Sequence, residues 1–191
     1  MRPAILLGIV LAPAIAACGG GGADRNCLTP EDYGAATLTA QVAEGEGAVP
    51  ATPDFIGFEA QLNDDAKPDL IGLEFYKGSG VFATNIVPGT YTLSGVELNY
   101  STCGMCVRAF TDYDDAAMMT ADEEYYATGG TIVITEVNPN IKGTFSDLEL
   151  EQVTVDPNST PPFKSTPVAD GCTTTIASGS FDVAVTFTAA N

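Results

Sequence analysis

Short runs in which apolar and polar residues alternate recur along residues 35–191 and constrain the fold more than any other feature of the sequence. Such runs occupy residues 56–62, 71–75 and 181–188. Successive side chains of an extended strand point to opposite faces, so each run would bury one face and expose the other. Gly, Pro and Asn residues between the runs favour turns. We therefore expect an all-β fold, a single antiparallel β-sandwich of jelly-roll or immunoglobulin-like type.

Two segments make this expectation more specific. Residues 131–137 are apolar on both faces, which favours a central strand. Residues 148–150 place leucines on one face of a strand, whereas residues 153–155 place valines on the other. Because a shift of one residue reverses the face of a strand, we expect either that the strand ends between the two pairs, or that a β-bulge at residues 151–152 restores the face.

Proline-containing segments predict turns and loops. Residues 87–93, with the sequence Val-Pro-Gly-Thr-Tyr-Thr-Leu, resemble the turn and following strand of several extracellular β-sandwich modules, which supports the sandwich expectation. Residues 158–167 contain three prolines and follow Pro157, so they predict an irregular surface loop.

The N-terminus has the features of an export signal. Arg2 supplies one positive charge, and residues 4–17 are almost wholly apolar but shorter than the about 20 residues that a membrane-spanning helix needs. The segment ends in Ile15-Ala16-Ala17-Cys18. These four residues resemble the bacterial lipobox. The resemblance implies cleavage before Cys18, a diacylglyceryl group on its sulfur, N-acylation in many bacteria, and a lipid bilayer as the partner of the acylated cysteine.

The resemblance also divides the chain and suggests its location. Residues 1–17 would be the lipoprotein signal peptide, residues 18–30 the lipidated cysteine with a glycine-rich tether, and residues 31–191 the β-sandwich domain. Gly19 stands where enteric bacteria use Asp to retain lipoproteins in the inner membrane. The resemblance therefore implies a lipid-anchored protein of the bacterial cell envelope and favours the outer membrane.

Four further cysteines would lie in the exported part, namely Cys27, Cys103, Cys106 and Cys172. In an oxidising compartment they predict two disulfides, for which three connectivities exist. We expect the pairs Cys103–Cys106 and Cys27–Cys172. A redox-active pair or a metal site is the alternative for the Cys-x-x-Cys motif, but residues 107–110 look like a strand rather than the helix that would lower the pKa of the first thiol.

Acidic residues crowd into one segment of thirteen residues. Calcium binds six to eight oxygen atoms, several of them from carboxylates on a bending loop. The segment therefore predicts a candidate calcium site, with a solvated acidic loop as the alternative; no other cofactor is expected. The candidate ligands are Asp112, Asp114, Asp115, Asp122 and Glu123, with Glu124 beside them.

Charge and composition narrow the function. The net charge of −18 opposes binding to nucleic acid, and the absence of histidine removes Ser-His-Asp and Cys-His catalysis. We therefore expect a non-enzymatic binding or structural module for an unknown protein or glycan ligand. The alternatives are a calcium-dependent ligand-binding module and a thiol redox protein that uses Cys103 and Cys106.

Overall fold

The predicted all-β class is confirmed by the computed structural model, which describes residues 35–38, 40–46, 53–63, 65–114 and 120–188. Two short 3-10 helices, η1 (Gly80–Phe82) and η2 (Gly95–Leu98), are the helical elements of these ranges. Nothing helical in the described part of the chain has the length and apolarity required to cross a membrane.

Eleven strands form one hydrogen-bonded sheet, in the order β1-β10-β8-β7-β6-β4-β3-β2-β11, with β5 added to β7 and β9 added to β8. Most neighbours are antiparallel. The strands are β1 (Ala35–Leu38), β2 (Ala40–Glu46), β3 (Phe55–Gln61), β4 (Leu70–Tyr76), β5 (Gly89–Thr92), β6 (Met105–Thr111), β7 (Glu123–Glu136), β8 (Asn140–Asp156), β9 (Lys164–Pro167), β10 (Thr173–Ala184) and β11 (Thr186–Thr188).

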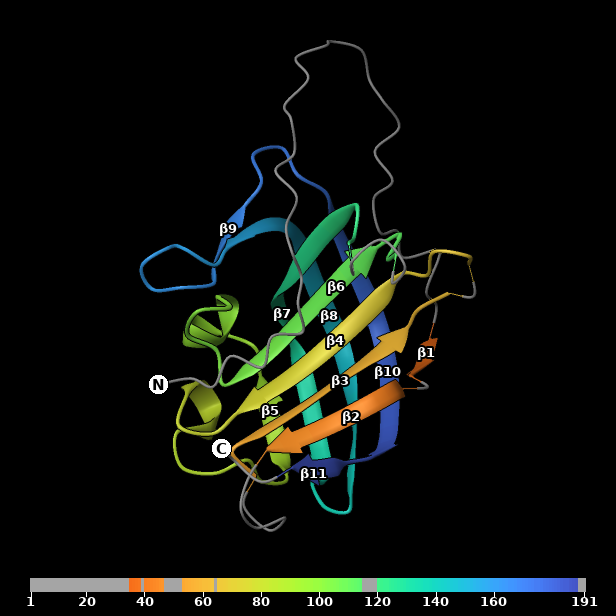
Figure 1. Ribbon diagram of the computed structural model, residues 1–191, viewed down its shortest axis with the longest axis vertical. Coiled ribbons are helices and arrows are strands. Elements are labelled where there is room, and N and C mark those ends of the chain that lie inside the picture. The colour runs from red at the N-terminus through yellow and green to blue at the C-terminus, as the bar shows by residue number, and fades with distance from the viewer. Residues whose placement is uncertain (1–34, 39, 47–52, 64, 115–119, 189–191) are drawn as a thin grey trace.

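The sheet is strongly curled. Strands β2, β3, β4 and β6 cross the front of the molecule in Figure 1, and β7, β8 and β10 lie behind them. Strand β1, at one end of the sheet, pairs in parallel with β10, and β11, at the other end, pairs in parallel with β2. Because β1 and β2 follow one another in the chain, as do β10 and β11, each end of the sheet combines the first and the last strands of the domain. Because all the strands belong to one sheet, the predicted sandwich type stays a prediction.

The main core fills the inside of the curl. Residues of β3 and β4 alternate as predicted, with Ile56, Phe58 and Leu73 buried. The rings of Phe58 on β3 and Phe181 on β10 are 5.1 Å apart between centroids, although these strands are not hydrogen-bonded neighbours. The core therefore joins the two halves of the sheet by side-chain contact.

A bend in β7 and β8 keeps both strands on this core. Tyr125 and Ala127 face the core before the bend, whereas Ile132 and Ile134 face it afterwards, so the buried parity changes. Gly130 lies at the change with a φ of 126°, a conformation that favours glycine. Relative to β8, β7 has one extra residue between Ala127 and Gly129, and β8 has one extra residue opposite the step from Gly129 to Thr131, so the two strands change parity together.

Both expectations for the change of parity near residues 151–152 are wrong. Strand β8 continues through this segment, and its pairing with β7 shows no register shift there. Val153 and Val155 instead face the opposite side of the sheet from Leu148 and Leu150, where they are also buried. The expectation that the buried residues of one strand all point to the same face failed here, because this part of the sheet is covered on both faces.

The remaining sequence predictions have mixed outcomes. Residues 131–136 do belong to a central strand, β7, which lies between β6 and β8; the strand begins earlier, at Glu123, and ends before Val137. Residues 89–92 form β5, as expected from the turn-and-strand pattern. The irregular loop predicted for residues 158–167 is wrong at its end, because β9 pairs with the last residues of β8.

Candidate functional site

Strand β6 is buried along its whole length, and its second face carries the most organised polar cluster of the described residues. Cys106, Arg108 and Phe110 project from this face. A small apolar cluster lies on this face, formed by Cys103, Cys106, Tyr126, Val153 and Val155 with Tyr76 and Tyr100 against it. Tyr100, in the turn after η2, packs against this cluster, and the Tyr126 hydroxyl donates to the Glu97 carbonyl oxygen of η2 at 2.9 Å.

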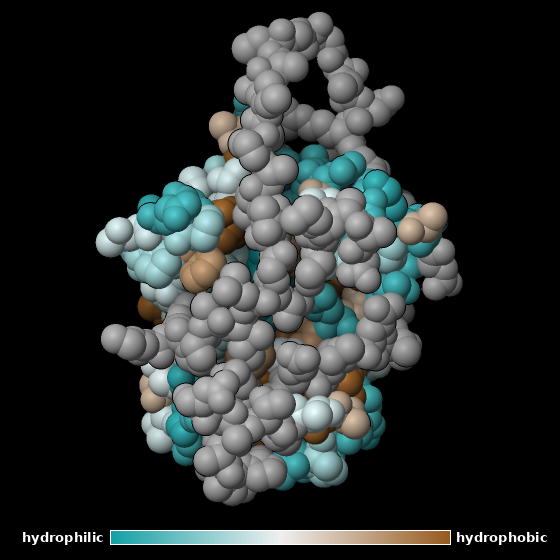
Figure 2. All heavy atoms as spheres, viewed as in Figure 1, coloured by the Kyte–Doolittle hydropathy of each residue, from teal (hydrophilic) through white to brown (hydrophobic). Residues whose placement is uncertain are grey.

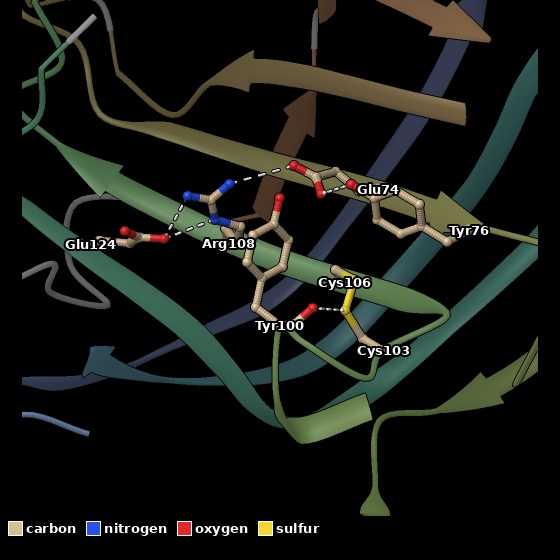
Figure 3. Close-up of polar contacts among 7 residues, drawn as sticks. All are labelled: Glu74, Tyr76, Tyr100, Cys103, Cys106, Arg108 and Glu124. Carbon is tan, nitrogen blue, oxygen red and sulfur yellow. Dashed lines mark hydrogen bonds and ion pairs between the residues drawn. A yellow bond between two sulfur atoms is a disulfide. The ribbon is translucent and has the colours of Figure 1, made fainter. Parts of the chain in front are cut away.

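Arg108 lies between carboxylates from the two neighbouring strands (Figure 3). Its Nε and Nη2 both donate to Glu124 Oε1 on β7, at 2.8 and 2.6 Å. Its Nη1 lies 3.5 Å from Glu74 Oε1 on β4. Gly72 is the direct cross-strand partner of Arg108 and has no side chain, which leaves room for the guanidinium.

Aromatic rings enclose the same guanidinium. Its Cζ lies 4.4 Å from the centroid of Tyr100 and 4.8 Å from that of Phe110, distances at which cation–π attraction operates. Burial by itself would lower the pKa of Arg108, but Glu124, Tyr100 and Glu74 outweigh it and the net shift is upward. The guanidinium therefore stays charged, and two carboxylates of opposite charge compensate it.

Tyrosine hydroxyls complete the network. The Tyr76 hydroxyl donates to Glu74 Oε2 at 2.7 Å. Burial and the neighbouring Glu74 carboxylate raise the pKa of Tyr76, and the same two causes raise the pKa of Tyr100 to about 12. Both hydroxyls are therefore protonated at neutral pH, and neither is available as a base.

The predicted Cys103–Cys106 pair forms a disulfide, with Cα atoms 5.4 Å apart. Both residues are completely buried, and Cys103 Sγ lies 3.3 Å from the Tyr100 carbonyl oxygen. A thiolate cannot reach either sulfur in this fold, which favours a structural disulfide over redox exchange. Cys172 is also disulfide-bonded, but Cys27 lies outside the described residues, so the Cys27–Cys172 pairing stays a prediction.

The acidic segment divides between separate partners. Glu124 binds Arg108, Glu123 Oε2 accepts a hydrogen bond from Tyr125 at 2.7 Å, and Asp114 Oδ2 lies 3.1 Å from Lys67 Nζ. The Asp112 backbone N–H donates to Asp69. Asp115 lies outside the described residues, and Asp122 joins no group of three metal-binding side chains within them. The calcium site stays a prediction.

Sequence reasoning missed two residues that organise the structure, Arg108 and Glu97. Each has a signal in the sequence: Arg108 is the only charged residue between positions 98 and 111, and Glu97 is the only one between positions 78 and 107. A lone charge in an otherwise uncharged stretch of a strongly acidic chain indicates that the structure requires it there. The partners were not visible, because they come from other strands.

No protein-family model, curated protein or solved structure matches this chain. The chemistry of the Arg108 cluster therefore rests on its own contacts. The charge of Arg108 is compensated by two carboxylates and the Tyr76 and Tyr100 hydroxyls are protonated, so the cluster is suited to holding β4, β6 and β7 together under the cover of Tyr100. Breaking such a buried ion pair typically costs about 3–5 kcal/mol.

Burial of the Cys103–Cys106 disulfide predicts resistance to reduction. In the folded protein, millimolar dithiothreitol should leave both cysteines unreactive to an alkylating agent, whereas the same treatment in urea should expose them. The measurement is mass spectrometry of the labelled peptides. Rapid labelling of Cys103 in the folded state would instead support the thiol redox alternative.

The tyrosine cluster predicts loss of stability at alkaline pH. Unfolded tyrosine loses its proton near pH 10, whereas folded Tyr100 keeps its proton to about pH 12. The stabilisation is therefore complete below pH 10 and falls as pH rises towards 12, by about 1.4 kcal/mol per pH unit for each such tyrosine. Urea denaturation between pH 8 and pH 11 measures this slope, and Tyr100→Phe should make it shallower. An unchanged slope in that variant would contradict the assignment.

The divided acidic segment predicts no preference for calcium. If its carboxylates act only as separate surface charges, millimolar calcium and magnesium should raise the melting temperature equally at low salt, because both ions screen repulsion in the same way. A specific site would respond more to calcium, since magnesium requires tighter octahedral geometry. A larger rise with calcium that Asp112→Asn with Asp114→Asn abolishes would establish the site.

Proposed function

We propose that the chain is an exported bacterial lipoprotein, anchored in the cell envelope by acylated Cys18, whose β domain binds or scaffolds a ligand without catalysing a reaction. Disulfide bonding of Cys103, Cys106 and Cys172 is the observation that supports export most directly. Disulfides persist in oxidising compartments and are rare in the cytosol. The lipobox-like sequence adds the anchor, and its glycine at position 19 favours the outer membrane.

The buried charged residues bond to other parts of the fold, and this supports a binding or scaffolding role. Arg108 is compensated by Glu74 and Glu124, and the buried Glu97 carboxylate accepts three backbone N–H groups, from Val81, Gly104 and Met105. These groups hold elements of the fold together. A protein or glycan ligand would then contact the outside of a rigid domain.

We also infer that the single curled sheet folds over on itself and packs as two layers, as the two sheets of the expected sandwich would. The contact between Phe58 and Phe181 crosses the core between strands that do not pair. This packing resembles that of facing sheets, in which side chains of the two inner faces interdigitate.

The anchor is tested by Cys18→Ser in the full chain. The variant should leave the membrane fraction and lose incorporation of a labelled fatty acid, because the thiol that carries the lipid is absent. Cys27→Ser is the matched control, since it removes a nearby cysteine but keeps the lipobox, and it should stay labelled and membrane-bound. Membrane attachment of Cys18→Ser at the level of the unmodified chain would disprove the lipoprotein assignment.

A further inference from the structure

Residues 78–107 contain a single charged side chain, Glu97. At the average of 17% charged residues in this chain, thirty residues would contain about five. The segment includes η1, β5, η2 and the start of β6, so its lack of charge spans several elements that follow one another at one end of the sheet.

Glu97 itself does not reach the surface. Its residue is 2% exposed, and its carboxylate accepts hydrogen bonds from the backbone N–H groups of Val81 at 2.8 Å, Gly104 at 2.9 Å and Met105 at 2.7 Å. Charge-assisted bonds of this kind are about twice as strong as neutral ones. They fix η1, η2 and the turn before β6 to one another, so the segment is rigid and itself contributes no charged side chain to the surface.

Apolar side chains occupy this surface. Val81 on η1 is 40% exposed, and Val96 and Leu98 on η2 are 57% and 37% exposed. The Glu97 bond to the Val81 backbone holds η1 against η2, and these three exposed side chains of the two helices are here named the uncharged face. Hydrophobic surface is visible in Figure 2 at the left edge of the molecule, where η2 lies in Figure 1.

We propose that the uncharged face lies against the phospholipid bilayer in which the chain is anchored; this inference rests on the proposed lipoprotein function. The chain has a net charge of −18, so anionic lipid repels most of its surface at distances within the Debye length, about 10 Å. The uncharged face avoids this repulsion, and exposed aliphatic side chains gain by burial at the boundary of headgroups and acyl chains. A second copy of the chain would instead add a further acidic surface.

The length of the tether allows this orientation. Sixteen residues separate Cys18 from Ala35, where β1 begins, and sixteen residues can span at most about 55 Å. The segment from Ala35 to the end of β2 at Glu46 has twelve residues, about 40 Å at the rise of a strand. Strand β2 ends beside Phe55, and Phe55 pairs with Tyr76 just before η1, so the anchor can reach the end of the sheet that carries the uncharged face.

Tryptophan fluorescence tests the orientation, because the chain has no tryptophan of its own. Val96→Trp places one indole on the uncharged face. Thr175→Trp is the matched control, at an exposed position of β10 beside Glu149. The acylated full-length variants are reconstituted into phosphatidylethanolamine–phosphatidylglycerol vesicles with brominated acyl chains, which quench indoles near them.

Emission of the Val96→Trp protein should be blue-shifted and largely quenched on the vesicles, whereas the Thr175→Trp protein should keep its emission. Adding Leu98→Asp to Val96→Trp should restore emission, because the new charge opposes contact with the lipid. Equal emission of the two tryptophan variants overturns the orientation. A blue shift of Val96→Trp that depends on protein concentration without lipid also overturns it and assigns the face to self-association.

Flotation of the same samples keeps this result separate from the test of the anchor. Vesicle-bound protein with an unquenched Val96→Trp leaves the lipoprotein function standing and removes only the orientation. Failure of the purified full-length chain to float removes both.

Discussion

Strand β6 is covered on both of its faces, and the rest of the structure depends on how each cover is made. One face packs into the main core inside the curled sheet. The other carries Arg108, whose charge must be compensated because an unpaired buried ion costs several kcal/mol. Glu74 and Glu124 come from the strands on either side of β6, so compensation of this one charge also ties three adjacent strands together.

The cover over Arg108 is itself held by a second buried charge. Tyr100 stacks on the guanidinium and belongs to the turn that runs from η2 to the Cys103–Cys106 disulfide. Glu97 precedes this turn and fixes it by accepting hydrogen bonds from the Gly104 and Met105 N–H groups that follow it. Strand β9 adds an outer contact, because Asn99 donates to the Ser165 carbonyl oxygen at 2.9 Å. A disulfide, a carboxylate and a short strand therefore stabilise one small cap.

The alternation of apolar residues was sufficient to predict β3 and β4, because a strand with one buried face must follow a period of two. The same reasoning gave the wrong result for Val153 and Val155, since parity carries no information about burial where the sheet is covered on both faces. Arg108 and its carboxylate partners were missed for a different reason. Their meeting depends on the register between strands, which a single sequence does not specify.

The distribution of the few basic residues explains why an uncharged surface matters in this molecule. Of the basic residues that the structure describes, Lys67, Lys77 and Lys142 lie in ion pairs with Asp114, Asp54 and Asp182, Arg108 is buried, and Lys164 is exposed on β9. The paired cations therefore neutralise neighbouring carboxylates instead of forming a basic surface, and the field around the domain is acidic. Such a field repels an anionic membrane or an acidic partner, and the repulsion is weaker where carboxylates are absent or buried. Burial of Glu97 removes the last charge from the surface of η1 and η2, so the bond network that stabilises the cap also leaves these two helices without an exposed carboxylate.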